Sequence, residues 1–576
     1  MGIHWIDLTV LILYLLGITV LGVWMSRRVK TMGDYFMPRR FGSMTMIMHS
    51  FGTGTASDQA VTVASGTAQN GISGIWYQWL WLIPTPFYWL VAPIMRRFRA
   101  VTTADVLTLR FDMSVAVLFS IVGIVSMSVK IGAILKGAAA VVDSGTGGLL
   151  DSTMAIAAIT ILFLIYGIAG GLSAAIVTDF VQGILTIVFS FILLPFVFSA
   201  VGGMAGIRET ITDPNLLSLA TPKKISTFFV IMLGIQGLVG IVAQPHVMGV
   251  CGAGKTEKEG RIGFMVGNLV KRLCTVAWCL TGIAAVAWYL NQGLELDQIR
   301  NKEFADKIYG DMANTFLPRI SPGLLGIFLA SLLAAVMSSC DSFMISSAGL
   351  FSENIYKPLF PNKSIGHYLM VSRVTSVAVV AGGVCFAIFV PNVVEALEIW
   401  FKISPMSGIA FWMCLFWRRM TVAGAWATTV TGFATWWLST LPRFVSFAAG
   451  LPGARPLGFI WEEGGKQSIH EPWKILFYMA CATIAGIVVS FLTCPVDKQK
   501  LDRFHELIRT PVQPGEVIEE PCTLPPGVTV PDRKMLINCC GIEVPAPSAT
   551  SVWGFSAGTL AGVVLVVLFW WFAKSG

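Results

Sequence analysis

Apolar runs of about 20 residues recur along nearly the whole chain and restrict its fold more than any other feature. Each run is long enough to cross a hydrocarbon core of roughly 30 Å as a helix. Charged residues make up 12% of the 576 residues, against about 25% in an ordinary soluble domain. The first run lacks the basic flank and cleavage site of a signal peptide, so we expect it to remain as a span. The sequence therefore predicts an all-α polytopic membrane protein, held in a lipid bilayer, with about 14 transmembrane helices.

The basic residues indicate how the chain is oriented in the membrane. The formal net charge is +8, but most Lys and Arg side chains lie in short loops beside apolar runs, which argues against nucleic acid as a partner. With the N-terminus outside, every markedly basic short loop falls on the cytoplasmic side, as the positive-inside rule requires. These loops contain Arg27, Arg28, Lys30, Arg39, Arg40, Arg96, Arg97, Arg99, Arg110, Lys255, Lys258, Arg261, Lys357, Lys363, Arg418 and Arg419.

The second apolar run, residues 44–69, is interrupted by flexible and polar residues. Its stretch 51–60 contains Gly52, Gly54, hydroxyl side chains and the carboxylate of Asp58. Glycine is a poor helix former, and an unwound segment frees backbone carbonyls that suit a weakly bound cation. We therefore expect a broken helix with Asp58 near mid-depth. The alternative for the two glycines is that they only allow close helix packing.

The ninth apolar run, residues 322–350, has one polar face. At 100° per residue, Ser338, Asp341 and Ser342 share a side, with Ala335 just behind and Ser339 at the edge. The structural alternative is that each serine bonds back to the carbonyl four residues earlier. Because an ionisable group in hydrocarbon costs at least about 2.5 kcal/mol, the cluster indicates an ion site or a polar pathway.

Other polar residues enter further runs. Asp179 and Gln182 lie near the cytoplasmic end of the sixth run, where helix capping or snorkelling is the alternative to a functional role. Lys130 lies in the fourth run, and Lys271 and Arg272 lie in the eighth. Long basic side chains near an interface usually extend to the headgroups, so we expect Arg272 to snorkel.

The segment 495–548 is the one extended polar insertion. Its repeated prolines prevent a long helix, so the sequence predicts a cytoplasmic linker. Residues 497–508 have the spacing of a short amphipathic helix on the membrane surface, although a solvated run of charges is the favoured interpretation. The tryptophans, among them Trp81 and Trp400, are interpreted mainly as interfacial anchors or packing residues, and the alternative is that one of them lines a substrate path.

Short motifs in these runs resemble the sodium/solute symporter family. The most diagnostic is Gly170-Gly171-Leu172 followed by Thr178-Asp179 and Gln182-Gly183, a pattern that is rare in an apolar helix. Further matches occur in the expected order over most of the chain, at residues 33–37, 96–112, 244–246 with 253–255, and 403–405 with 416–419.

The resemblance implies a LeuT-type core of two inverted five-helix repeats with extra helices at both ends. Fourteen spans are typical of the sodium/glucose cotransporter branch. The implied parts are an N-terminal helix and cytoplasmic loop (1–43), the first repeat (44–200), an extracellular loop (201–225), the second repeat (226–420), two additional helices (421–494), the linker (495–550) and a C-terminal helix (551–576).

The resemblance also implies ion ligands. The family's conserved sodium site would use the carbonyls of Gly52, Thr55 and Ala335 and the hydroxyls of Ser338 and Ser339. A second sodium site, found in some members, would use Asp179, Ser338, Asp341 and Ser342. Asp341 stands where the family usually has serine. It could strengthen ion binding or, if protonated, link transport partly to protons.

The implied solute contacts come from two branches of the family. In the sugar branch they map to Gln59, Gln78 and Lys271, with His246 in place of an inner-gate tyrosine. Asp58 and Gln244, with their neighbours, look instead like the proline-permease branch. The solute therefore stays open between a sugar, an amino acid and a carboxylate.

The resemblance thus implies a secondary active transporter that carries a small organic solute together with Na⁺ by alternating access. We expect a multi-pass protein of the plasma membrane, or of the inner membrane in a bacterium, that functions as a monomer. The alternatives are a proton-coupled symporter and a solute sensor without net transport. A membrane enzyme is disfavoured, because the histidines have no metal-ligand spacing and no nucleophile has an evident base.

Overall fold

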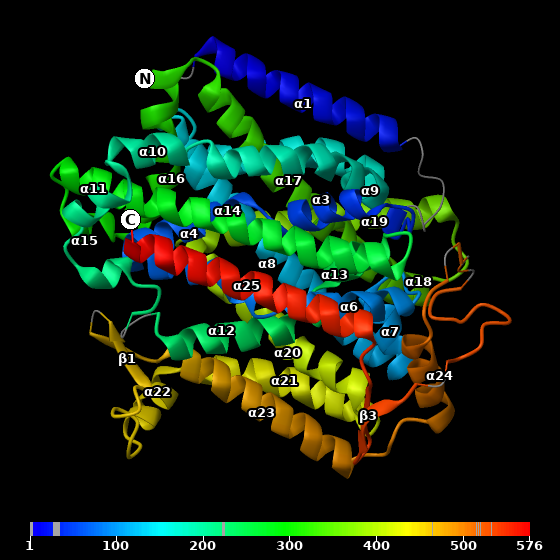
Figure 1. The fold of residues 1–576 in the computed structure, drawn as a ribbon. Helices are drawn as coiled ribbons and strands as arrows, with labels where there is room; N and C mark the ends of the chain where they lie inside the picture. The colour runs from blue at the N-terminus through cyan, green and yellow to red at the C-terminus, as the bar shows by residue number, and fades with distance from the viewer. Residues whose placement is uncertain are drawn as a thin grey trace.

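Long apolar helices run roughly parallel or antiparallel to one another and pack into one bundle (Figure 1). The computed structural model describes residues 4–26, 35–221, 225–463, 465–513, 515–516, 518, 520–531 and 533–575. Arg27, Arg28 and Lys30, part of the predicted cytoplasmic charge, lie outside the described residues, as do residues 33 and 34 of the first family motif.

The bundle is built from helices of very different lengths. In chain order they are α1 (Trp5–Ser26), α3 (Ser43–Gly54), α4 (Ser57–Asn70), α5 (Trp76–Trp79), α6 (Thr85–Arg97), α8 (Met113–Gly145), α9 (Ser152–Phe191), α12 (Thr227–Gly240), α13 (Pro245–Gly252), α14 (Glu257–Asn291), α17 (Leu324–Phe351), α19 (Ile365–Phe389), α20 (Val393–Phe416), α21 (Val422–Leu438), α23 (Glu471–Leu492) and α25 (Ala549–Ser575).

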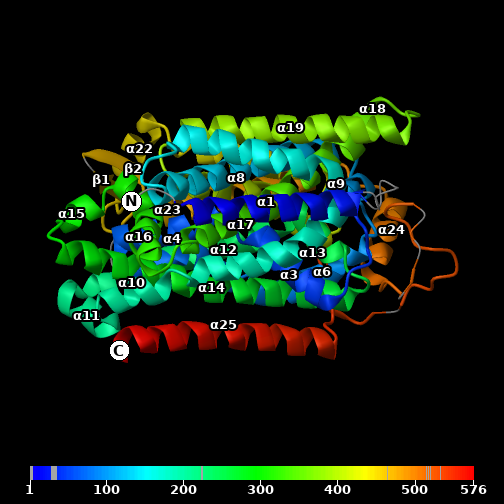
Figure 2. The same cartoon turned by 90° about the horizontal axis from the view of Figure 1, so that it is seen from above.

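Shorter elements cap the two ends of the bundle. They are α7 (Thr103–Arg110), α10 (Leu194–Ala200), α11 (Gly203–Thr210), α15 (Leu296–Ile299), α16 (Lys302–Ile320), α18 (Lys357–Leu359), α22 (Pro442–Ala449), α24 (Lys498–Arg509) and the antiparallel hairpins β1–β2 (Ile460–Glu463, Lys466–Ile469) and β3–β4 (Met535–Cys539, Ile542–Pro545). Figure 2 shows α18 and α24 at one end, and α11, α15 and the β1–β2 hairpin at the other. The end that holds α24 is the predicted cytoplasmic end.

Among the described residues, nine helices are long and apolar enough to cross a membrane, and the pair α12–α13, bent by 70°, makes a tenth. The remaining predicted spans fall on helices that are broken or short, such as α3 and α4 with 12 and 14 residues. The predicted class of helical membrane protein is therefore confirmed, while the number 14 stays a prediction.

The second span is broken, as its glycines and hydroxyl residues predict. Helix α3 ends at Gly54, and α4 begins at Ser57. Between them, Thr55 (φ −123°, ψ 97°) and Ala56 (φ −114°, ψ 166°) are extended, so their backbone groups leave the helical hydrogen-bond pattern. The ninth span, α17, is by contrast one continuous helix of 28 residues.

A second break, which the sequence reasoning missed, lies between α12 and α13. Gln244 is extended (φ −78°, ψ 116°), and Pro245 occupies the first position of α13. Proline lacks a backbone N–H and disfavours a helical residue before it, so it ends one helix and starts the next. The motif Gln244-Pro245 was therefore the available signal.

Gly171, in the glycine pair of the family motif, separates the fifth and sixth apolar runs. Its φ of 58° and ψ of −168° interrupt α9, and only glycine adopts such angles without strain. A Cβ at Gly171 would also lie 2.5 Å from the ring of Tyr35. The break therefore needs glycine for two reasons.

Small residues bring the central helices into close contact. A Cβ at Gly52 of α3 would lie 2.5 Å from Ser338 Oγ of α17, and one at Gly137 of α8 would lie 2.6 Å from the Cα of Asp58. Small residues at helix contacts let backbones approach, which is how packing is gained in a membrane. The packing explanation for Gly52 is thus correct. It is compatible with the helix break, which begins after Gly54.

The interpretation of residues 497–508 as a solvated run of charges is wrong. These residues form α24, and Leu501, Phe504 and Leu507 are buried against the ends of α6 and α7. Spacing of three residues puts these apolar side chains on one face, so docking buries them while the charges face outward. Arg418, just after the end of α20, forms an ion pair with Asp502 of α24.

Candidate functional site

The break between α3 and α4 meets α17 inside the bundle. Ser339 Oγ donates a hydrogen bond to the carbonyl of Gly52 over 3.0 Å, and Ser338 Oγ lies against Gly52. Ala335 precedes both serines by about one turn of α17 and is fully buried. Thr55 is buried at the break, and its hydroxyl has no hydrogen-bond partner among the described residues. The structure therefore brings the break and the two serines of the predicted sodium site together.

Asp179 lies beside this junction and is fully buried. Its Oδ1 accepts a hydrogen bond from Ser338 over 2.5 Å, and its Oδ2 lies 2.6 Å from Nδ1 of His49. Ser342 Oγ is 2.9 Å from the hydroxyl of Thr53, which also contacts His49. Asp179 therefore neither caps a helix nor extends to the headgroups, because its carboxylate binds side chains of two other helices.

Asp341 occupies the same face of α17, 1% exposed. Its carboxylate packs directly against Gly167 of α9. The second set of predicted ligands is thus buried between α3, α9 and α17. His49 and Thr53 of α3 belong to this cluster but were missed. Their spacing of four residues, which places them on one face of a helix, was the signal that could have found them.

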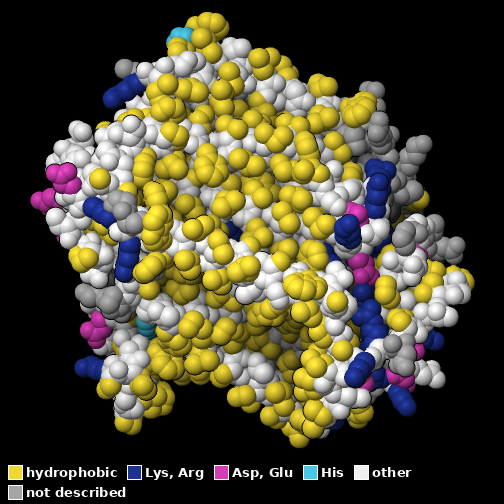
Figure 3. Space-filling model, viewed as in Figure 1, with side chains coloured by type: hydrophobic (Ala, Val, Ile, Leu, Met, Phe, Trp, Pro, Cys, Tyr) yellow, Lys and Arg dark blue, Asp and Glu magenta, His cyan; other side chains and the backbone are white. Residues whose placement is uncertain are grey.

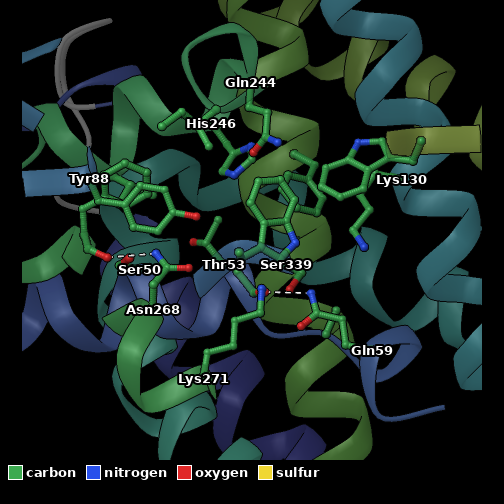
Figure 4. A pocket seen from close by; sticks show the side chains of 18 residues that line it. Ser50, Thr53, Gln59, Tyr88, Lys130, Gln244, His246, Asn268, Lys271 and Ser339 are labelled. Atoms are coloured by element: carbon green, nitrogen blue, oxygen red, sulfur yellow. Dashed lines mark hydrogen bonds between the residues drawn. The ribbon is translucent and has the colours of Figure 1, made fainter. Parts of the chain in front are cut away.

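A polar cavity of about 50 Å³ adjoins the break (Figure 4). Of the predicted solute contacts, Gln59, Gln244, His246 and Lys271 line it, together with Ser339 of the predicted sodium set. The cavity thus touches both breaks, since Gln244 lies between α12 and α13. Further polar lining residues that the sequence reasoning did not assign are Ser50, Thr53, Tyr88, Lys130 and Asn268.

The carbonyl of Gly54, the last residue of α3, connects the cavity with the break. Lys271 Nζ and Gln59 Nε2 both donate hydrogen bonds to it, the latter over 2.8 Å (Figure 4). A freed carbonyl at a helix end needs such partners. Two cavity side chains therefore hold the backbone one residue before Thr55.

Asp58 and Gln78, two predicted solute contacts, do not line the cavity. Asp58 Oδ2 forms an ion pair with Lys130 Nζ at 2.6 Å, and both side chains are at most 2% exposed. The Lys130 ammonium also lies 4.5 Å from the ring centre of Trp400, a cation–π contact. The side chain of Gln78 is buried without a hydrogen-bond partner among the described residues.

The expectation that Arg272 snorkels is wrong. Its side chain is fully buried and donates to the backbone carbonyl of Gln78 and, over 3.3 Å, to that of Asn268. The irregular segment around α5 leaves carbonyls for it to bind, so it does not need to reach the headgroups.

Trp81 and Trp400 are buried and line the solute cavity, so they are packing residues that border the substrate path rather than interfacial anchors. Their ring centres lie 6.1 Å apart, and both also line a smaller cavity of about 10 Å³ that extends toward Gln236 of α12. The two rings therefore line both cavities.

The geometry can be compared with known proteins. The model of the sodium:solute symporter family matches residues 35–432. Sodium/glucose cotransporter 4 of Danio rerio is 23% identical and the match covers 90% of this chain and 84% of that protein. The sodium/pantothenate symporter of Haemophilus influenzae is 25% identical, covering 71% and 86%. The high-affinity proline transporter of Bacillus subtilis is 27% identical, covering 72% and 88%.

Among solved structures, the chain is similar to a Na⁺-coupled sialic acid symporter in a substrate-bound outward-open state. The TM-score is 0.67 at 18% identity, and the match covers 86% of this chain and 99% of that chain. This likeness confirms the predicted LeuT-type fold class.

Proposed function

Because the chain belongs to the sodium:solute symporter family, we propose that it uses the sodium gradient to carry a small polar solute across the membrane by alternating access. The observation that supports this most directly is the junction of the α3–α4 break with Ser338 and Ser339, next to a polar cavity. The family is one of transporters, so an enzymatic role has no support from the comparisons. We further propose the plasma membrane as its location and the monomer as its functional unit.

The first proposed sodium site consists of the carbonyls of Gly52, Thr55 and Ala335 and the hydroxyls of Ser338 and Ser339. An all-oxygen set suits a hard cation, and the Asp179 carboxylate behind Ser338 adds negative charge. In the described arrangement, both serine hydroxyls donate to other oxygens. A hydroxyl that donates its proton keeps two lone pairs, so both serines can coordinate sodium while these hydrogen bonds persist, and the ion would bridge α3 and α17.

The second proposed ion site lies between Asp179, Asp341 and Ser342. Two carboxylates and several hydroxyls in a buried space suit a second sodium ion or a proton. The His49–Asp179 contact favours the proton as the second candidate, because an imidazole beside a carboxylate can exchange a proton with it. A sodium-driven transport rate that is unchanged between pH 5.5 and 8 would exclude this candidate.

The solute is proposed to carry a carboxylate. Two ammonium groups, Lys130 and Lys271, line the cavity, and no carboxylate does among its described lining residues. Asp58 compensates Lys130, whereas Lys271 forms no ion pair within the described part of the chain. A buried charge is stabilised by a partner of opposite sign. Because the cavity holds only about 50 Å³, its walls must separate to admit a solute.

Coupling is proposed to run through Gly54. A carboxylate that binds Lys271 would compete for the ammonium that now holds the Gly54 carbonyl. Releasing that carbonyl would change the backbone at Thr55, a proposed sodium ligand. Each ligand would then alter the affinity for the other, and this coupling is necessarily reciprocal.

The test is uptake of labelled sugars, amino acids and carboxylates into proteoliposomes under an inward gradient of sodium or of choline. We expect sodium-dependent uptake in the wild type and at least a tenfold loss in the double variant Ser338→Ala/Ser339→Ala. Ser347→Ala is the matched control, because among the described residues this buried serine of α17 bonds only back to the carbonyl of Phe343. Equal uptake by the double variant would refute the sodium assignment, and saturable solute binding without counterflow would indicate a sensor.

The same assay tests the solute class. Lys271→Gln keeps a donor for the Gly54 carbonyl but removes the charge. We expect a KM for the carboxylate solute that is raised at least tenfold, since a lost charged hydrogen bond costs roughly 1.5–3 kcal/mol. Lys136→Gln serves as the control, because Lys136 is a half-buried residue of α8 that does not line the cavity. A neutral solute that both variants transport equally would contradict the proposal that the solute carries a carboxylate.

A further inference from the structure

A second and much larger cavity, of about 560 Å³, lies at the predicted cytoplasmic end of the bundle. It is enclosed by the ends of α6 and α20, by α24, by the β3–β4 hairpin and by the start of α25. Its apolar wall is formed by Leu90, Pro93, Ile94, Leu415, Phe416 and Leu536. None of its lining residues belongs to the proposed sodium or solute sites.

The other wall of this cavity is strongly basic. Arg97, Arg261, Arg509, Arg533 and Lys534 line it, with Glu543 as the one carboxylate among the described lining residues. Glu543 contacts Arg509, and Arg97 is compensated by two hydrogen bonds, of 2.7 and 2.8 Å, to Glu257 behind the wall.

Arg261 and Arg533 share one nearby carboxylate, that of Glu257, which already binds Arg97. Neither forms an ion pair with a residue that the structure describes. Arg261 bonds to the hydroxyl of Ser551 over 3.3 Å and lies 5.5 Å from the ring centre of Trp89, and neither contact brings a negative charge. With the exposed Lys534, the cavity has a surplus of positive charge and room for an anion.

The two walls lie at different depths of the membrane. Leu90 precedes Arg97 by about two turns of α6, and Arg97 is the last residue of that helix. The apolar wall therefore extends toward the hydrocarbon core, and the basic wall lies at the interface. Figure 3 shows the same division on the surface, where Lys and Arg side chains gather toward the end that carries α24, beside a broad apolar band.

We propose that this cavity binds one anionic phospholipid. Its phosphate lies between Arg261 and Arg533, and an acyl chain follows Leu90, Ile94 and Phe416. Basic pockets at the cytoplasmic side of membrane helices are suited to anionic headgroups. A free anion would use only the basic wall and a neutral lipid only the apolar wall, whereas an anionic phospholipid uses both. The lipid holds the β3–β4 hairpin and the start of α25 against α6.

The experiment is native mass spectrometry of the full chain in detergent, titrated with phosphatidylglycerol or with phosphatidylcholine. We expect saturable binding of one phosphatidylglycerol and at least tenfold weaker binding of phosphatidylcholine. Arg261→Gln/Arg533→Gln should weaken phosphatidylglycerol binding about thirtyfold, given the usual contribution of two basic residues at an anionic membrane surface.

The matched control is Lys498→Gln/Arg503→Gln, which removes two charges from exposed positions of α24 outside the cavity. It should bind phosphatidylglycerol as the wild type does, and all variants are compared only if their thermal unfolding temperatures agree. Equal weakening by both double variants, or none by either, would overturn the proposal.

A third variant tests the apolar wall. Leu536 is 67% exposed, so Leu536→Asp should leave the fold intact and still weaken phosphatidylglycerol binding at least threefold. Displacement of the bound lipid by 10 mM inorganic phosphate would instead show a site for free anions and would overturn the lipid assignment.

Discussion

Several buried carboxylates in this bundle lie at helix contacts, and each of them has a partner from another helix. Asp58 pairs with Lys130, Asp179 contacts His49 and Ser338, and Asp306 accepts from Ser65. An unpaired ionisable group in a bilayer costs at least about 2.5 kcal/mol, so each partner offsets part of that cost. The sequence identified most of the carboxylates in these pairs, because a carboxylate in an apolar run is easily recognised. It did not identify their partners, because pairing depends on how distant helices pack.

The Asp58–Lys130 pair gives a prediction at the residue scale. Asp58→Asn should destabilise the protein by about 3–5 kcal/mol, because it leaves the buried Lys130 ammonium uncompensated. Asp58→Asn/Lys130→Met removes both charges and should recover at least half of the loss. Thermal unfolding in detergent measures both. A double variant no more stable than the single one would show that the pair is not the stabilising interaction.

At the scale of elements, breaks in helices create the site. The α3–α4 break could be predicted, since glycine and hydroxyl residues interrupt an apolar run over residues 51–57. The α12–α13 break was missed, although Pro245 marks it, because the run around it is long enough to be taken as one continuous span. The docking of α24 was also missed. Its charged residues outnumber its apolar residues, and the sequence alone does not show the surface against which the apolar side chains pack.

The contact between α3 and α17 gives a prediction at this scale. In Gly52→Ala the new Cβ would lie 2.5 Å from Ser338 Oγ, so α17 or the break must shift. We expect at least a tenfold loss of sodium affinity and a destabilisation of about 1–3 kcal/mol, as for other overpacked sites. Gly17→Ala in α1 is the control, because no atom lies within 4 Å of its Cβ. Sodium-dependent tryptophan fluorescence, titrated for both variants, measures the affinity; equal affinities would contradict the proposed ligand set.

At the scale of the whole molecule, the fold class could be predicted, and the exact assembly could not. Apolar runs define a helical membrane protein and basic loops predict its orientation, because both follow from the properties of the bilayer. The cavities depend on long-range packing of α3, α8, α14 and α17, which local sequence does not encode. Trp81 and Trp400 illustrate this, since a tryptophan in an apolar run suits an interface and a cavity equally well.

The central claim is that sodium binds where the α3–α4 break meets α17. Equilibrium binding of radioactive sodium to the purified wild type, to Ser338→Ala/Ser339→Ala and to Ser347→Ala tests it most directly, without any solute. We expect saturable binding to the wild type and to Ser347→Ala, and loss of at least one bound ion in the double variant. The same number of ions bound at the same affinity by all three proteins would contradict it.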